Sequence, residues 1–537
     1  MHLRKLDWRG GYAPKLVAAA ALVALGDWLF FQHQRYGGAF GLFGIAMIAA
    51  LVLARPAVRG DLRAWALAGL AVLYGAAMAY DANMLAWCLF WIAAGMATLI
   101  PATGRFDDGW RWFQRLFFHG FTSLFGPLID FYKLSRARRG RKATRFGLRA
   151  SLPVLVLPVV GSGVILLLFA SANPLIEQAL TAITPPDLSI ENVARLALWS
   201  VLFILTLGLL RPRLPRRLLG TFDGRGDLRL PGVSLASVTL SLIAFNALFA
   251  LQNSLDIAYL WGMVPLPEGM TLAEYAHRGA YPLILTALLA GLFVLVVLRP
   301  GSQTAETPLV RRLVMLWIAQ NVFLVGSSIL RTLDYVEAYS LTVLRISALL
   351  WMGLVAVGLV LVGWRMLRGH SAGWLINANL AAAGVLLTGV CFVDLGAVAA
   401  NWNVRHAREI DGRGAMLDLC YLNRLGGSSL LPLIDLEQRP LPAELHQRVH
   451  NVRVAVHRRL LDEVTQGGWT WLGEQRLTAA AQRLGGKLDL PQDDRRFMCD
   501  GDVFPPPPPV VDAAQSAEAA IMPTAPDSPT LTRETER

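Results

Sequence analysis

Long apolar blocks recur along almost the whole of this chain, and they leave few folds open to it. Residues 154–172 and 283–298 form two of these blocks, and a run of about 18 apolar residues is long enough to cross a lipid bilayer. Hydrophobic residues make up 55% of the chain and charged residues only 16%, whereas a soluble domain has about 25% charged residues. The sequence therefore predicts an all-α, polytopic transmembrane bundle whose main partner is the lipid bilayer.

The apolar blocks predict about eleven membrane spans, followed by a small, mainly helical extramembrane domain. The first four blocks are short and rich in Ala and Gly, which leaves the number of spans among them open. Small residues are expected there because they let membrane helices approach closely. The expected spans are 15–31, 38–54, 64–81, 83–101, 150–172, 192–210, 232–251, 279–298, 311–330, 339–363 and 374–398.

Basic residues are divided very unevenly between alternate loops. One set of alternate loops carries 29 Lys and Arg, whereas the opposite set carries only Arg35, Arg278 and Arg331. Lys and Arg mark cytoplasmic loops. We therefore expect a multi-pass protein of the bacterial inner membrane, with its N-terminus in the cytoplasm and its C-terminus in the periplasm. This topology accounts for the net charge of +12, so nucleic acid is not an expected partner.

The segment 102–149 is the main cytoplasmic feature that the sequence predicts. Its first half repeats large apolar residues at helical spacing, and a run of Lys and Arg follows over residues 133–145. A basic, aromatic-rich amphipathic helix of this kind suits the head-group layer. It could bind anionic lipid head groups over residues 110–145, although a role in topology alone is the simpler explanation. The repeated apolar residues are Trp110, Phe113, Phe117, Phe121 and Leu124.

The composition divides the chain into five regions. These are an N-terminal four-span region (1–101), the basic amphipathic segment (102–149), a main seven-span domain (150–400), a periplasmic domain (401–503) and a Pro-rich disordered tail (504–537). Within the periplasmic domain, the stretch 442–464 has the apolar spacing of an amphipathic helix. Pro442 suits the first turn of that helix, where a missing N–H costs nothing.

Four cysteines fall into two groups. Cys88 and Cys391 lie within expected spans, where a thiol behaves as a small apolar group. Cys420 and Cys499 lie near the two ends of the periplasmic domain. An oxidising compartment favours a disulfide between them. Two free thiols are the less favoured alternative, and a metal site is less favoured still because neither cysteine has a partner at ligand spacing.

Four stretches of the second half resemble a bacterial family of multi-pass membrane proteins that is catalogued as a domain of unknown function. They are residues 253–262 (NSLDIAYLWG), 267–282 (PEGMTLAEYAHRGAYP), 320–331 (QNVFLVGSSILR) and 335–346 (YVEAYSLTVLRI). The resemblance is strongest over residues 150–400. It implies the same many-span topology and carries no activity, substrate or cofactor.

Polar residues between positions 246 and 345 are the candidates for a substrate or ion pathway, because ionisable groups in or near hydrocarbon suggest function. Asn246, Asn253 and Asp256 share one helical face by their spacing, and the other candidates lie in or beside loops on the same side of the membrane. The alternative is a structural cluster in which Arg331 or Arg345 neutralises a nearby acid. The remaining candidates are Glu274, His277, Arg278, Asp334 and Glu337.

Two further acids, Asp27 and Asp394, lie near the ends of expected spans. Each stands alone in the sequence, so we expect its side chain to reach the membrane interface rather than to relay protons. His446, His450 and His457 form a helical stripe without a fourth ligand, so no metal is expected. No cofactor is expected either, because the sequence lacks a P-loop, a dinucleotide glycine fingerprint, HExxH and GxSxG.

The absence of these motifs makes enzymatic activity uncertain and the less favoured expectation. Transport or envelope sensing through the polar cluster is the leading hypothesis. An enzyme of envelope or lipid metabolism is the alternative, with the same cluster binding a head group. A sensor or assembly factor without a translocation path is a third possibility, and the sequence identifies no protein partner.

Overall fold

A computed structural model describes residues 12–130 except 105, 189–220 except 216, 234–260, 306–486 and 497–503, with a few single residues between these ranges. The expected tail 504–537 lies outside the described residues. The expected spans 150–172 and 279–298 lie largely outside them too. In the described ranges the structure is helical, and eight helices are long and apolar enough to cross a membrane. This agrees with the predicted all-α, polytopic bundle.

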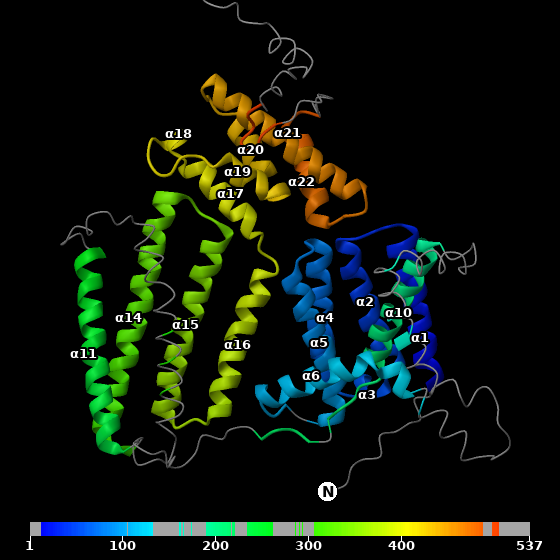
Figure 1. Cartoon of the computed structure of the whole chain (residues 1–537), viewed down its shortest axis with the longest axis horizontal. Coiled ribbons are helices and arrows are strands. Elements are labelled where there is room, and N and C mark those ends of the chain that lie inside the picture. Colours follow the sequence, from blue (N-terminus) through cyan, green and yellow to red (C-terminus); the bar gives the residue numbers. More distant parts are fainter. Residues whose placement is uncertain are drawn as a thin grey trace, which may run out of the picture.

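Five of the expected spans form a first bundle, which is on the right in Figure 1. A single hydrophobic core joins them, and α10 packs against α1 although a long stretch of chain separates the two helices. The helices are α1 (Tyr12–Gly26, continued by the π-helix η1, Asp27–Gln32), α2 (Gly38–Ala54), α4 (Leu62–Tyr80), α5 (Met84–Thr103) and α10 (Ile190–Leu210).

Four further helices form a second bundle around a separate core. They are α11 (Leu235–Leu260), α14 (Pro308–Tyr339), α15 (Val343–Arg368) and α16 (Ala372–Val390). Helix α16 lies on the side nearest the first bundle (Figure 1). There the hydroxyl oxygens of Tyr74 on α4 and Thr388 on α16 lie 2.8 Å apart, so a hydrogen bond joins the two bundles.

The remaining helices lie at the two ends of the bundles. The short α3 (Pro56–Arg59) and the longer α6 (Gly109–Leu124) lie at one end, where α6 runs across the spans rather than along them (Figure 1). Helix α6 buries Trp112 and His119 against the bundle and exposes Phe113, Phe117 and Phe121. This is the amphipathic helix that the sequence predicts. We call this end of the molecule the open face.

A compact helical domain covers the other end, which we call the capped face (Figure 1). We define residues 395–486 and 497–503 as the cap domain. It consists of α17 (Leu395–His406), α18 (Arg408–Asp411), α19 (Leu419–Arg424), the 3-10 helix η2 (Gly426–Ser429), α20 (Leu430–Glu437), α21 (Ala443–Thr465) and α22 (Trp471–Arg483). The start of α1 and the cap domain are on opposite sides of the first bundle (Figure 1).

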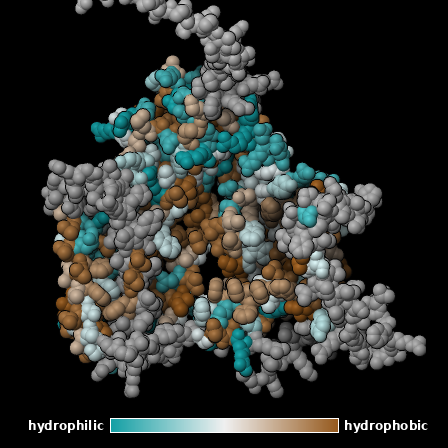
Figure 2. All heavy atoms as spheres, viewed as in Figure 1, coloured by the Kyte–Doolittle hydropathy of each residue, from teal (hydrophilic) through white to brown (hydrophobic). Residues whose placement is uncertain are grey.

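The cap domain has its own core and its own covalent crosslink. Helix α21 buries Val449, Val452 and Val456, as its apolar spacing predicts, and Pro442 is the residue that precedes its first turn. Cys420 and Cys499 form a disulfide with their Cα atoms 4.7 Å apart, so the predicted bridge is confirmed. Hydrophilic residues gather over the cap domain, whereas hydrophobic residues dominate the bundles below it (Figure 2).

One expected span ends earlier than the sequence suggests. The block 374–398 divides because α16 ends at Val390 and α17 begins at Leu395. The physical reason is Asp394, whose carboxylate accepts a hydrogen bond from the backbone N–H of Ala397 at 3.0 Å. A carboxylate in this position caps the start of a new helix, so Leu395 and the residues after it leave the membrane bundle and join the cap domain.

Candidate functional site

The predicted polar cluster lies along the contact between α11 and α14, and we call its described part the polar seam. Asn246 is buried, and its Nδ2 donates hydrogen bonds to the carbonyl oxygens of Leu242 (2.7 Å) and Leu313 (3.0 Å). Its Oδ1 accepts a bond from Gln320 Nε2 at 3.0 Å. Seven residues further along α11, Asn253 Nδ2 donates a hydrogen bond to the Gln320 carbonyl oxygen at 3.3 Å. The seam therefore joins the two helices at matching positions.

The capped end of the seam is charged. Asp256 is only 1% exposed, and its carboxylate forms an ion pair with Arg331 of α14. Gln252 and Ser327 each donate a hydrogen bond of 2.7 Å to the same carboxylate. A buried charge is tolerated when it is paired and its remaining lone pairs are satisfied. The Asp256 carboxylate consequently finds its partners within α11 and α14 themselves.

Two acceptors of the seam remain unused among the described residues. Asn253 Oδ1 and Gln320 Oε1 are buried without a hydrogen-bond donor. Each such group costs about 1–3 kcal/mol of desolvation in a folded protein. The seam thus combines an ionic end, where the Asp256 carboxylate has three partners, with an amide end that keeps two unused acceptors.

The other predicted site residues lie elsewhere. Glu274, His277 and Arg278 are outside the described residues. Asp334 and Glu337 are on α14 beyond the seam, and both are exposed. The expected pairing of Arg345 with an acid is wrong: its Nη1 donates to the carbonyl oxygens of Tyr339 and Ser340, and its guanidinium lies 4.2 Å from the centre of the Tyr335 ring. Arg345 therefore closes the α14–α15 turn, and of the two arginines proposed to neutralise an acid, Arg331 does so.

The α14–α15 turn is also the place where the second bundle meets the cap domain. Asn403 of α17 exchanges two hydrogen bonds with the backbone of Leu341, at 2.7 Å from the Leu341 N–H and 2.9 Å to its carbonyl. The hydroxyl of Tyr421 accepts a bond from the N–H of Val343 at 2.8 Å. Tyr421 is adjacent to Cys420, so the turn is attached to the disulfide-linked part of the cap domain.

A second attachment lies between the two bundles. Arg476 of α22 pairs with Asp394, and Ser428 donates to the same carboxylate at 3.0 Å. The pKa of the neighbouring Asp81 carboxyl at the end of α4 is raised, mainly by burial. The charge of Arg476 lowers this pKa and the charge of Asp394 raises it. Arg476 is thus the positive centre of an acidic junction that includes α4, α16 and the cap domain.

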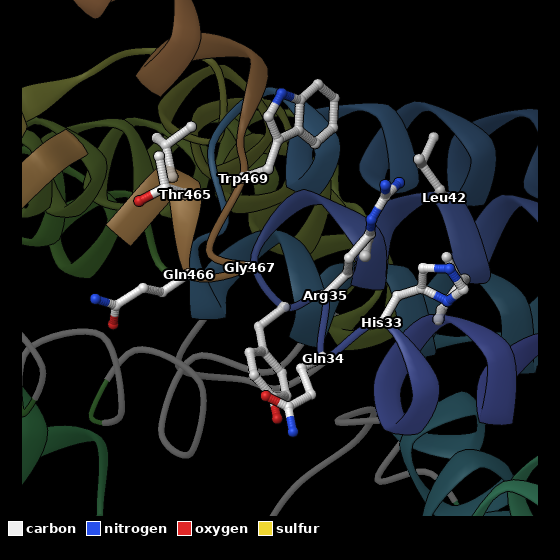
Figure 3. A pocket seen from close by; sticks show the side chains of 12 residues that line it. His33, Gln34, Arg35, Leu42, Thr465, Gln466, Gly467 and Trp469 are labelled. Atoms are coloured by element: carbon white, nitrogen blue, oxygen red, sulfur yellow. The ribbon is translucent and has the colours of Figure 1, made fainter. Parts of the chain in front are cut away.

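The third attachment joins the cap domain to the α1–α2 turn. Tyr36 N donates to the Gly467 carbonyl at 2.6 Å, and Gly38 N donates to the Trp469 carbonyl at 2.7 Å. Beside these bonds lies a groove of about 690 Å³ between residues 33–36 and 464–469, which we call the cap groove (Figure 3). It is lined by Leu29, His33, Gln34, Arg35, Tyr36, Ala39, Leu42, Val464, Thr465, Gln466, Gly467 and Trp469.

The two acids that appear isolated in the sequence both have partners. Asp27 forms an ion pair of 2.6 Å with Arg195 of α10 and accepts a bond of 2.8 Å from Trp199. Asp394 pairs with Arg476, as described above. Both partners lie far away along the chain, and for this reason the sequence gives no sign of the pairing.

On the α14 side of the seam, sequence reasoning identified Arg331 but missed Gln320 and Ser327. Gln320 and Ser327 are seven residues apart and Arg331 follows four residues later, which is close to the spacing of Asn246, Asn253 and Asp256 on α11. Two polar stripes of similar spacing on separate spans are a signal for pairing, because residues seven apart share a helical face. The partners in the cap domain, Asn403 and Tyr421, carry no comparable signal.

The fold and the seam define a polytopic helical membrane protein with two bundles under one cap domain. A family model described as a domain of unknown function, DUF4153, matches residues 65–436. The chain belongs to this family, which confirms the resemblance found in the sequence. The match includes the second bundle, the first half of the cap domain and the helices of the first bundle from α4 onward, but not α1 and α2. Comparisons with curated proteins and with solved structures gave no match.

Proposed function

We propose that this protein is an envelope sensor, in which the cap domain detects a condition or ligand outside the cytoplasm and α14 transmits it to the polar seam. The observation that carries this proposal is the attachment of the cap domain to the α14–α15 turn through Asn403 and Tyr421. The same helix carries Gln320, Ser327 and Arg331 of the seam. A displacement of the cap domain would therefore act on one end of α14. It would change the hydrogen bonds and the ion pair that α14 forms with α11 in the seam.

The backbone conformation of the attached turns supports this proposal. Among the described residues, only Gln34 and Ser340 have positive φ angles without being glycine, at 45° and 70°. Gln34 is in the α1–α2 turn and Ser340 is in the α14–α15 turn, and the cap domain contacts both turns. A strained backbone persists only where its surroundings hold it, and it is frequent in switch regions. The cap domain supplies those surroundings at both positions.

Transport and catalysis are less well supported by the geometry of the seam. The polar side chains of α11 and α14 form hydrogen bonds with one another, and three described cavities are lined by other residues. A closed buried polar network favours a specific register between two helices. The seam is thus better suited to a change between two helix arrangements than to a path for a substrate.

The sensing proposal requires the cap domain to face the periplasm, and this orientation is testable. Reporter fusions after residues 140, 220 and 305 are expected to report the cytoplasm, and fusions after residues 185, 265 and 420 the periplasm. The physical reason is the retention of Lys-rich and Arg-rich loops on the cytoplasmic side. A cytoplasmic signal at residue 420 would contradict both the orientation and the sensing proposal.

Coupling between the cap domain and the seam can be measured by hydrogen exchange on the full-length protein in detergent. Asn403→Ala is expected to expose the Leu341 backbone and also to accelerate exchange in residues 246–256 and 320–331 by about tenfold, because unpaired backbone groups cost about 1–3 kcal/mol. Asn401→Ala is the matched control, since the described bond of this side chain is to Ala397 within the same helix. Faster exchange at Leu341 with an unchanged seam would show that the cap domain is only a cover.

A further inference from the structure

The cap groove carries positive charge that nothing described neutralises. Arg35 is exposed and its guanidinium has no hydrogen-bond acceptor among the described residues, while His33 lines the same groove. Figure 3 shows the Arg35 guanidinium between the indole ring of Trp469 and the side chains of His33 and Leu42. None of the described residues that line the groove is Asp or Glu. Its charge is therefore complementary to an anion.

The walls of the groove are held in place by backbone contacts rather than by flexible side chains. Gly467 has φ of +103°, and a Cβ at this position would collide with the Gln34 carbonyl oxygen. Gly37 has φ of +59°, and its Cβ would lie 2.8 Å from the Trp469 carbonyl oxygen. The two turns thus approach as closely as they do because both positions are glycine. A preformed groove loses little conformational entropy when it binds a ligand.

The position of the groove indicates how the anion is presented. His33, Gln34 and Arg35 lie in the turn between the apolar helices α1 and α2, on the side of the cap domain. A turn at the end of helices that cross a bilayer lies at the level of the lipid head groups. The side of the groove nearest the bundle is apolar and includes Leu29, Ala39 and Leu42, of which Leu42 is 49% exposed. A ligand that fills both sides must have an anionic head and an apolar chain. Trp469 adds an aromatic ring at the same level, as is typical of the membrane interface.

We propose that the cap groove binds the phosphate group of an anionic phospholipid from the leaflet on the capped face. The Arg35 guanidinium donates two parallel hydrogen bonds to the phosphate oxygens, a geometry that arginine favours. The acyl chains lie along the exposed side of α2 at Leu42. This site is separate from residues 110–145 on the open face, and the inference does not depend on the sensing function.

The inference is tested with the full-length protein in a neutral detergent. Phosphatidylglycerol, phosphatidylcholine and glycerol 3-phosphate are titrated, and bound lipid is measured by native mass spectrometry. Arg35→Gln is expected to weaken phosphatidylglycerol binding about fivefold, since one basic residue near a lipid surface contributes about that factor. Arg413→Gln is the matched control because it removes the same charge from an exposed position just after α18, and α18 lies on the opposite side of the cap domain from α22 (Figure 1). Its affinity should equal that of the parent.

Localisation uses a phosphatidylglycerol with a photoactivatable head group, which should label peptides that contain residues 33–36 or 464–469. Equal affinity of Arg35→Gln and the parent would overturn the inference. Equal binding of phosphatidylcholine would show that the groove does not select for net charge and would also overturn it. Competition by glycerol 3-phosphate at the same concentration would indicate a soluble phosphate ester as the ligand, in contradiction to the lipid. None of these outcomes bears on hydrogen exchange in the polar seam.

Discussion

Asp256→Asn is expected to lower the thermal stability of the full-length protein strongly. The substitution keeps the shape of the side chain and removes the charge that neutralises Arg331, whose side chain is 7% exposed. Leaving one member of a buried ion pair without its counter-charge costs about 3–5 kcal/mol. The melting temperature in a neutral detergent measures the effect, and the yield of folded protein from the membrane should fall with it.

The double variant Asp256→Asn/Arg331→Met separates the cost of an unpaired charge from a general loss of packing. It removes both charges and keeps an amide, whose oxygen can accept the bond from Gln252 while its NH2 group donates to the Ser327 hydroxyl. Replacement of a whole buried pair is often neutral or stabilising, so most of the lost stability should return. Glu337→Gln on the same helix is the control, because this side chain is exposed. If Asp256→Asn has the same melting temperature as the parent, the ion pair does not stabilise the contact between α11 and α14.

The elements that depend on local chemistry could be predicted from the sequence. Spans follow from the length of an apolar block, the amphipathic helix α6 from the repeat of aromatic residues, and α21 from its buried valines. These properties involve residues that are close along the chain. The disulfide could be predicted for a different reason, since the expectation of an oxidising compartment and the presence of two cysteines in one extramembrane domain together favour a bridge between them. The end of α16 was missed because the capping role of Asp394 was not recognised.

Pairing between distant spans could not be predicted in the same way. Asp27 is neutralised by Arg195, which is brought close only because α10 returns to the first bundle. By sequence, Asp256, Asp334 and Glu337 were the possible partners of Arg345, yet its guanidinium binds carbonyl oxygens of its own turn. A turn whose carbonyl groups point at an arginine satisfies that charge without any acid. The composition of neighbouring loops is therefore a weak guide to the partner of a charged residue.

Loss of the Cys420–Cys499 disulfide is the second large effect that we expect, and it should be confined to the cap domain. The bridge closes a loop of 79 residues. In the chain-entropy model a loop of this size contributes about 4–5 kcal/mol, which is a large part of the 5–15 kcal/mol that stabilises a typical domain. The variant Cys420→Ser/Cys499→Ser should therefore lower the free energy of unfolding of the cap domain by several kcal/mol at most.

Contacts other than the disulfide also hold the segment 497–503 in the folded cap domain, and they are weak. Without the bridge, the segment 497–503 is still held on α21 by the ion pair between Arg448 and Asp500 (2.8 Å) and by the bond from Asn451 to the Gly501 carbonyl (2.8 Å). The ion pair is partly exposed, so it contributes little. The amide bond is buried and contributes about 1 kcal/mol. These contacts keep the segment in place in the folded state, but they do not restrict the unfolded chain as the disulfide does.

Limited proteolysis and hydrogen exchange of the full-length protein distinguish a local effect from a global one. In the double serine variant, amides of α19 to α22 should exchange faster while those of α4 and α5, which pack in a separate core, keep the rates of the parent. Dithiothreitol should produce the same change in the parent and none in the variant. Cys88→Ser, which removes a free thiol in α5, is the control. Unchanged protection of the cap domain after loss of the bridge would show that its core is sufficient, and the α14–α15 turn would then be held by a domain that is stable without the crosslink.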